Sequence, residues 1–170
     1  MRTRALIGGL AAAIGATLAT GGAGAAAAQA ATTCMWGGTP AAPTGTFTIK
    51  PGLTDVPSAG PLQFKVTGHL SGPPGCSGRF SFDGQVDAGG TCSFNALEGV
   101  ARGLPGVARF AGHGVGPFGP SLLYDAAGEV VGSEDANVAT QANAPRFTDC
   151  GTPAGFTGGT FSSVIELFGW

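Results

Sequence analysis

The segment LQFKVTGHLSGPPGC, residues 62–76, holds the clearest structural pattern in this chain of 170 residues. Apolar or small residues alternate with polar ones from Leu62 to Leu70. A period of two residues is typical of a β-strand with one buried and one solvent-exposed face. The turn-forming residues 71–75, SGPPG, then end the strand and lead to Cys76. The segment joins a strand to a cysteine and so predicts a β fold that disulfides hold together.

The first 30 residues have the features of a secretory signal peptide. Arg2 and Arg4 precede an apolar run over 5–18, and small residues lead to Ala28-Gln29-Ala30. A membrane anchor needs about 20 strongly apolar residues, whereas this run is short and rich in Ala and Gly. The sequence therefore predicts signal cleavage after residue 30, a single secreted domain over 31–170, and no membrane span in the mature chain.

The charge balance disfavours some classes of partner. Removal of Arg2 and Arg4 leaves six of the eight basic residues against ten acidic ones, a net charge of about −4. The basic residues are scattered singly along the mature chain. Nucleic-acid and anionic-membrane binding both need clustered positive charge. We therefore expect no nucleic-acid partner and no binding to an anionic membrane, while protein, glycan and small-molecule partners stay open.

The four cysteines predict two disulfides. Thiols pair in an oxidising compartment, and no two of these cysteines have the close spacing of a zinc ribbon. If the strands near 47–50 and 62–70 are antiparallel neighbours, Cys34 and Cys76 emerge at the same end of the sheet. That geometry favours Cys34 with Cys76 and Cys92 with Cys150, although the two other pairings stay open. Each bridge would contribute about 4 kcal/mol to stability. Trp36 is expected to pack against the bridge at Cys34.

The rest of the mature chain continues the β pattern. Roughly seven to nine short strands are separated by Gly and Pro turns, with no amphipathic helix, which is typical of an antiparallel sandwich or barrel. We predict an all-β domain, either a β-sandwich of immunoglobulin-like architecture or a partly open barrel. The expected strands lie at 46–50, 62–70, 78–86, 91–102, 106–115, 121–124, 128–131, 137–142 and 160–168.

Two patterns that suggest chemistry do not satisfy its requirements. The glycine-rich residues 112–120 resemble a phosphate-binding loop, but no helix follows and Pro117 and Pro120 lack amide donors. His69 lies on the polar face of its predicted strand and His113 lies among glycines. Neither histidine belongs to a known nucleophile motif, so both are interpreted as surface residues. The sequence thus predicts no cofactor and no metal.

The acidic residues offer candidate pairs for hydrolysis or calcium binding. Asp83 with Asp87, or Glu129 with Glu134 and Asp135, could be imagined as a glycosidase pair. Carboxylates four residues apart on one strand lie roughly 13 Å apart, outside the ~5–9.5 Å that this chemistry uses. A calcium site would add Asp125, but the spacing matches no EF-hand loop. We interpret all of these carboxylates as solvated and name no catalytic residue.

Four motifs in order resemble small secreted four-cysteine proteins of Streptomyces and related actinobacteria. They are PGLT at 51–54, VTGHLSG at 66–72, GTCS at 90–93 and CGTPAGFTGGT at 150–160. The resemblance covers nearly the whole mature chain and implies an all-β secreted domain. It implies no activity and no catalytic residue.

We therefore expect a non-enzymatic module, secreted or associated with the cell wall, that binds an extracellular or cell-envelope protein or glycan. Such domains bind through end loops or an exposed sheet edge, and residues 115–120 and 129–135 are the first segments to test. One alternative is an inhibitor of extracellular enzymes, which requires a bridge-constrained loop with an exposed residue. Another is a hydrolase with an unrecognised carboxylate pair.

Overall fold

The computed structural model of the chain describes residues 31–114, 119–137 and 144–170. The predicted signal peptide, residues 1–30, lies outside these ranges. The elements in chain order are β1 (Thr32–Trp36), β2 (Gly38–Thr39), β3 (Ala42–Pro43), β4 (Gly45–Leu53), β5 (Leu62–Ser71), β6 (Gly78–Val86), β7 (Asn95–Arg102), β8 (Arg109–Gly114), β9 (Pro120–Tyr124), β10 (Val130–Asn137), the 3₁₀ helix η1 (Ala144–Gly151) and β11 (Phe156–Leu167). Across these elements, no helix has both the length and the apolar character that a membrane crossing requires.

The alternating segments form the strands that the sequence predicts. In β5 the apolar residues and Gly68 are buried, and the polar residues between them are exposed or half-buried. Strand β6 has the predicted bounds, 78–86. The segment 91–102, where apolar residues recur at a helical spacing, forms strand β7 from Asn95. The strand expected at 137–142 falls largely outside the described residues.

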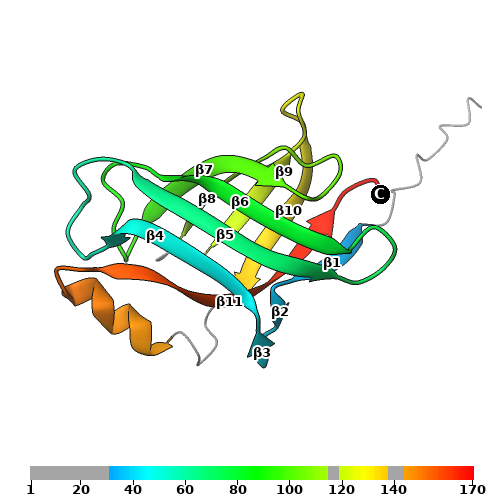
Figure 1. The fold of residues 1–170 in the computed structure, drawn as a ribbon. Coiled ribbons are helices and arrows are strands. Elements are labelled where there is room, and N and C mark those ends of the chain that lie inside the picture. Colours follow the sequence, from blue (N-terminus) through cyan, green and yellow to red (C-terminus); the bar gives the residue numbers. More distant parts are fainter. Residues whose placement is uncertain (1–30, 115–118, 138–143) are drawn as a thin grey trace, which may run out of the picture.

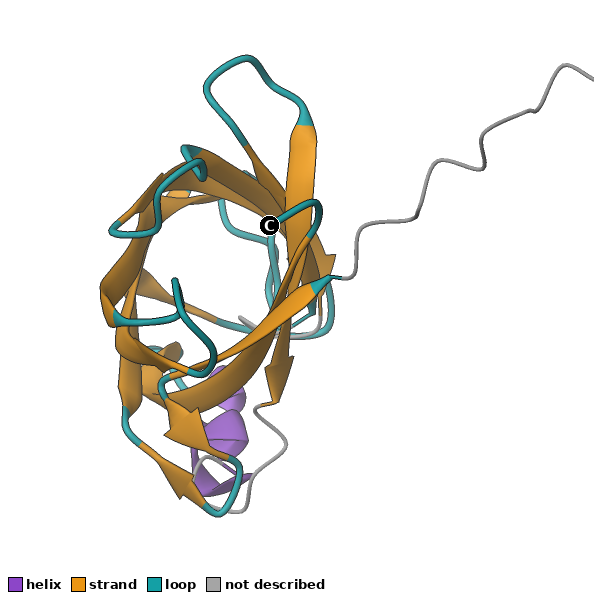
Figure 2. Ribbon diagram, turned by 90° about the vertical axis from the view of Figure 1, so that its right-hand side faces the viewer, coloured by secondary structure: helices purple, strands orange, loops and turns teal. Residues whose placement is uncertain are grey.

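The sheet closes into a barrel. Each strand pairs antiparallel with the next from β4 to β11 in the sheet order, and β11 returns to pair with β4 and β1. Strands β1 and β4 share one place in the wall, because both pair with β11 on one side and with β5 on the other. The nine strands of this sheet therefore fill eight positions. Figure 2 shows the ring of strands nearly end-on.

Closure corrects the expected architecture. The prediction of an all-β domain is confirmed, and of the two expected architectures the barrel is the one found, although it is closed and not partly open; the immunoglobulin-like sandwich is not confirmed. The period of two residues is the same in a sandwich and a barrel, so alternation alone could not distinguish them. The deciding feature is the length of β11, whose first half pairs with β4 and whose second half pairs with β1.

A small hairpin interrupts one wall position between β1 and β4. Strands β2 and β3 pair with each other outside the barrel sheet. The chain leaves at Gly37 and rejoins at Gly45, where the amides of Thr44 and Gly45 donate to the Gly37 carbonyl at 2.7 and 3.0 Å. In Figure 1 this hairpin projects below the barrel.

Aromatic rings fill the interior, and glycines make room for them. The Trp36 ring lies 4.6 Å from that of Phe161 and 4.8 Å from that of Phe82, centroid to centroid. A methyl group at Gly45 would come within 2.6 Å of Phe161 Cζ, and one at Gly68 within 2.9 Å of Trp36 Nε1. Since barrel interiors are filled by alternating small and large side chains, these glycines are part of the core packing.

The two disulfides clasp opposite ends of the barrel. Cys34 bonds to Cys76 where β5 leads into β6, and Cys92 bonds to Cys150 where the β6–β7 connection meets η1. This is the pairing that the sequence favours. Trp36, which was expected to pack on the first bridge, is buried against the rings of Phe80, Phe82 and Phe161 and donates from Nε1 to the Phe80 carbonyl at 3.1 Å.

The packing at Gly45 gives a first prediction. Gly45→Ala should destabilise the protein by about 1–3 kcal/mol, because the added methyl overlaps the Phe161 ring. Gly60→Ala is the matched control, since no atom lies within 4 Å of the position a methyl would take there. Urea unfolding with the disulfides intact measures both variants. Equal stability of the two would contradict this account of the core.

Candidate functional site

One carboxyl side chain lies inside the barrel. Glu134, near the middle of β10, is 5% exposed. Gly132 and Ala136 lie two positions to either side of it and are also at least partly buried. The interpretation of Glu134 as a solvated carboxylate is therefore wrong, because its place in the alternation turns it inward. The small residues around it, Gly132 and Ala136, were the sequence signal that a larger inward side chain could fit.

Two serines hold the carboxyl group. Ser163 on β11 donates from Oγ to Glu134 Oε1, and its Oγ also lies 3.0 Å from the carbonyl oxygen of Asp135. Ser121, directly opposite Glu134 on β9, contributes a second side-chain hydrogen bond. A hydroxyl can donate or accept. Ser163 can thus donate to an ionised carboxylate, or accept from a protonated one while donating to the Asp135 carbonyl.

The environment changes the acidity of this group. Burial raises the pKa of Glu134 from its ordinary 4.5 to about 7, because removal from water disfavours the charged form. The negative charge of Asp135 also raises the pKa, whereas the hydrogen bonds from Ser163 and Ser121 lower it. The carboxyl group can therefore hold or release a proton near neutral pH.

A small cavity adjoins the carboxyl group. Apart from Glu134 its lining is apolar: Trp36, Phe47, Phe64, Val66, Phe82, Ala136 and Phe161. The cavity volume in which the centre of a water molecule fits is about 20 Å³, which is enough for one water. The total volume not occupied by atoms in and around the cavity, including open solvent at its mouth, is about 270 Å³. At this point the packed core therefore contains a small cavity with one ionisable group at its edge.

Titration of Glu134 gives a second prediction. The folded-state pKa of about 7 exceeds the unfolded value, so the folded protein binds the proton more tightly. The contribution of protonated Glu134 to the free energy of unfolding should be fully present below pH 4.5. About 3 kcal/mol of it should be lost as the pH rises to about 7. Among the described residues no other titratable group lines the cavity, and Asp135 points outward and is exposed.

Glu134→Gln removes the titration and keeps the shape. The stability of the wild type relative to this variant should fall between pH 5 and pH 8, because an ionised carboxyl then replaces a neutral one in the core. Urea unfolding of both proteins across this range measures the difference, and all other titrating groups are common to both. Parallel stability profiles would show that Glu134 has an ordinary pKa.

Two of the other acidic candidates, Asp83 and Asp125, have local partners. Asp83 lies on the outer wall, where its carboxylate pairs with Lys65 at 3.2 Å and Arg102 at 2.8 Å. Asp125 accepts hydrogen bonds from the amides of Ala127 and Glu129, both at 2.9 Å, and so closes its own turn. The calcium grouping of Asp125 with Glu129, Glu134 and Asp135 is not assembled, because Glu134 faces the interior.

The two histidines are exposed, as the sequence predicts. His69 is exposed on β5, and His113 is exposed on β8 with its ring 6.5 Å from that of Phe94. Most of the glycine-rich segment 112–120 that resembles a phosphate loop lies outside the described residues, from 115 to 118.

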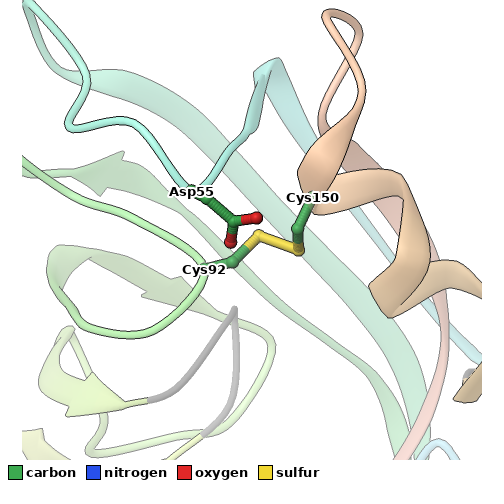
Figure 3. Close-up of side chains that lie close together, drawn as sticks. All are labelled: Asp55, Cys92 and Cys150. Carbon is green, nitrogen blue, oxygen red and sulfur yellow. A yellow bond between two sulfur atoms is a disulfide. The ribbon is translucent and has the colours of Figure 1, made fainter.

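The second bridge braces one end of the barrel. The amide of Cys92 donates to the Thr54 carbonyl at 2.9 Å, and the amide of Asp55 donates to the Cys150 carbonyl at 3.1 Å. These bonds join the β4–β5 connection, the β6–β7 connection and the end of η1. Figure 3 shows the Asp55 carboxylate beside the Cys92–Cys150 bond. One ligand atom from each of these residues lies within 4.8 Å of the others. Because the two sulfurs are bonded to each other, this cluster offers a metal only the carboxylate.

Two large apolar side chains are exposed on these joined connections. Val56 is 70% exposed and Phe94 is 63% exposed. The Thr54 hydroxyl bonds the amide and the carbonyl of Val56 at 3.2 and 2.9 Å. The Thr91 hydroxyl does the same for Phe94 at 3.1 and 3.2 Å. The backbone of each exposed residue is thus fixed by the hydroxyl of a threonine close to Cys92. The sequence identified the bridge but not these two side chains.

Comparison with protein-family models, with curated proteins and with solved structures finds no match for this chain.

Proposed function

We propose that this protein is a secreted, non-enzymatic module that binds an extracellular or cell-envelope protein through the braced end, the surface formed by Thr54, Asp55, Val56 and Phe94 beside the buried Cys92. The observation that carries the proposal is the exposure of Val56 and Phe94 on connections that a disulfide joins. Disulfides persist in oxidising compartments, which supports a place outside the cell.

Rigidity makes the braced end suited to binding. Immobilising a flexible side chain or loop on association costs about 0.5–1.5 kcal/mol per residue. Here the hydroxyls of Thr54 and Thr91 fix the backbone before any partner arrives. Burial of Val56 and Phe94 in a partner would then contribute about 1.5–3 kcal/mol each. Aromatic side chains in desolvated pockets are the usual centres of binding energy, so Phe94 is the expected anchor.

The charges at the braced end define the partner further. Asp55 and Asp87 are both exposed close to these connections. A complementary surface would therefore carry an apolar pocket with basic groups around it, because opposite potentials steer association. An extracellular enzyme whose cleft has such a pocket is a second candidate. The specific observation that favours it is Phe94, an exposed residue on a loop that a bridge constrains.

Substitution of the anchor tests the proposal. Mature wild-type protein, immobilised and exposed to culture medium and to solubilised envelope proteins, should retain a protein that Phe94→Ala loses by tenfold or more. Val100→Ala is the matched control, because Val100 is an exposed apolar residue, 43% exposed, on the outer wall. Retention by wild type and Val100→Ala, with loss by Phe94→Ala, supports the braced end.

Three outcomes would overturn the proposal: equal retention by Phe94→Ala, no retained protein, or retention of the module by insoluble cell-wall glycan instead. The inhibitor candidate is tested separately by incubation with a panel of extracellular proteases. Inhibition that Phe94→Ala abolishes would assign the partner as an enzyme, and cleavage without inhibition would exclude that enzyme.

A further inference from the structure

We propose that the barrel interior binds one small protonated amine, an ammonium ion or a short alkylammonium, against the Glu134 carboxylate. This binding site is separate from the braced end and does not depend on the function proposed above. It rests on three features of the cavity: its charge, its aromatic lining and its size.

The charge of the cavity is uncompensated by the described part of the chain. Glu134 is the sole ionisable residue of the lining. The described basic side chains whose exposure is known are all on the outside: Lys50, Lys65, Arg79, Arg102 and Arg109. A buried carboxylate without a positive partner is strongly disfavoured unless it takes up a proton. A bound cation would supply the missing partner and keep the interior neutral.

The lining suits a cation more than an anion or a polar neutral molecule. Five aromatic residues, Trp36, Phe47, Phe64, Phe82 and Phe161, contribute to the wall. Aromatic π-systems attract cations, most strongly where water is excluded. Besides the Glu134 carboxyl group, the lining side chains offer only the Trp36 Nε1–H, which already donates to the Phe80 carbonyl. A ligand with several polar atoms would therefore leave them unsatisfied.

Size restricts the ligand to a small amine. The 20 Å³ open to the centre of a water molecule matches an ammonium group, which is about as large as water. The total empty space of about 270 Å³, open solvent included, sets an upper limit that admits a short alkyl chain on the nitrogen. A quaternary ammonium has no N–H to donate to the carboxylate.

The carboxyl group is also arranged to accept the amine. When Glu134 is ionised, Ser163 and Ser121 satisfy part of its hydrogen-bonding capacity. A carboxylate has about four lone-pair sites, so positions are left for the N–H groups of a ligand. With a proton on Glu134 the positive partner is no longer needed. Amine binding should therefore displace this proton and strengthen as the pH rises from 5.5 to 8.

Unfolding with added salts tests the site. Mature protein at pH 8 is unfolded by urea in ammonium, methylammonium, tetramethylammonium or sodium chloride at equal ionic strength. A ligand that binds only the folded state raises the folding equilibrium constant by about 100-fold at 100 times its Kd. We expect the folding equilibrium constant to increase saturably with ammonium or methylammonium concentration, and both ions to bind at least tenfold more weakly at pH 5.5. Tetramethylammonium and sodium should give no saturable increase.

The Glu134→Gln variant should lose the increase that ammonium gives, while Gly60→Ala should keep it. Should the first variant not fold, nuclear Overhauser contacts between ¹⁵N-ammonium protons and the Trp36 ring in the wild type give an independent answer. An equal effect of sodium, retention of the effect in Glu134→Gln, or the absence of both saturation and contacts would overturn the proposal and leave water as the occupant.

Discussion

The pairing of β11 with both β4 and β1 is the constraint on which the rest of the structure depends. It converts a meander of antiparallel strands into a closed ring, so all inward side chains converge on one narrow axis. An eight-stranded barrel encloses little more than the volume of its own side chains. Large rings such as Trp36 and Phe161 then fit only where a facing position carries no side chain, as at Gly68 and Gly45.

The same narrowness explains why a carboxyl group in the interior matters. A carboxyl group on the outer face of the barrel would be solvated, whereas Glu134 is hydrogen-bonded to Ser163 and Ser121 and adjoins a cavity whose lining is otherwise apolar. Two hydroxyls compensate part of the lost hydration but supply no charge. An apolar residue of similar volume would avoid this loss of hydration, since buried ionisable groups are rarely optimal for stability. The interior thus combines a core that packs well with one group suited to chemistry or binding.

Much of the wall follows from local sequence, and much of the site does not. Alternation gave β5 and β6 almost to the residue, because each strand buries one face. Closure depends on long-range pairing of β11, which no local pattern contains. Glu134 was missed because charge is normally read as exposure, although Gly132 and Ala136 indicated free volume beside it. Phe94 was missed because exposure of an apolar residue depends on what the fold leaves uncovered.

The excursion between Gly37 and Gly45 has a consequence for protein engineering. The chain departs from the wall and re-enters it at the same place, with its two ends joined through the Gly37 carbonyl. Loop-closure entropy grows slowly with loop length, so a grafted peptide or epitope could replace the tip of this hairpin without altering the register of either neighbour. The scaffold would then display foreign sequence on its flank.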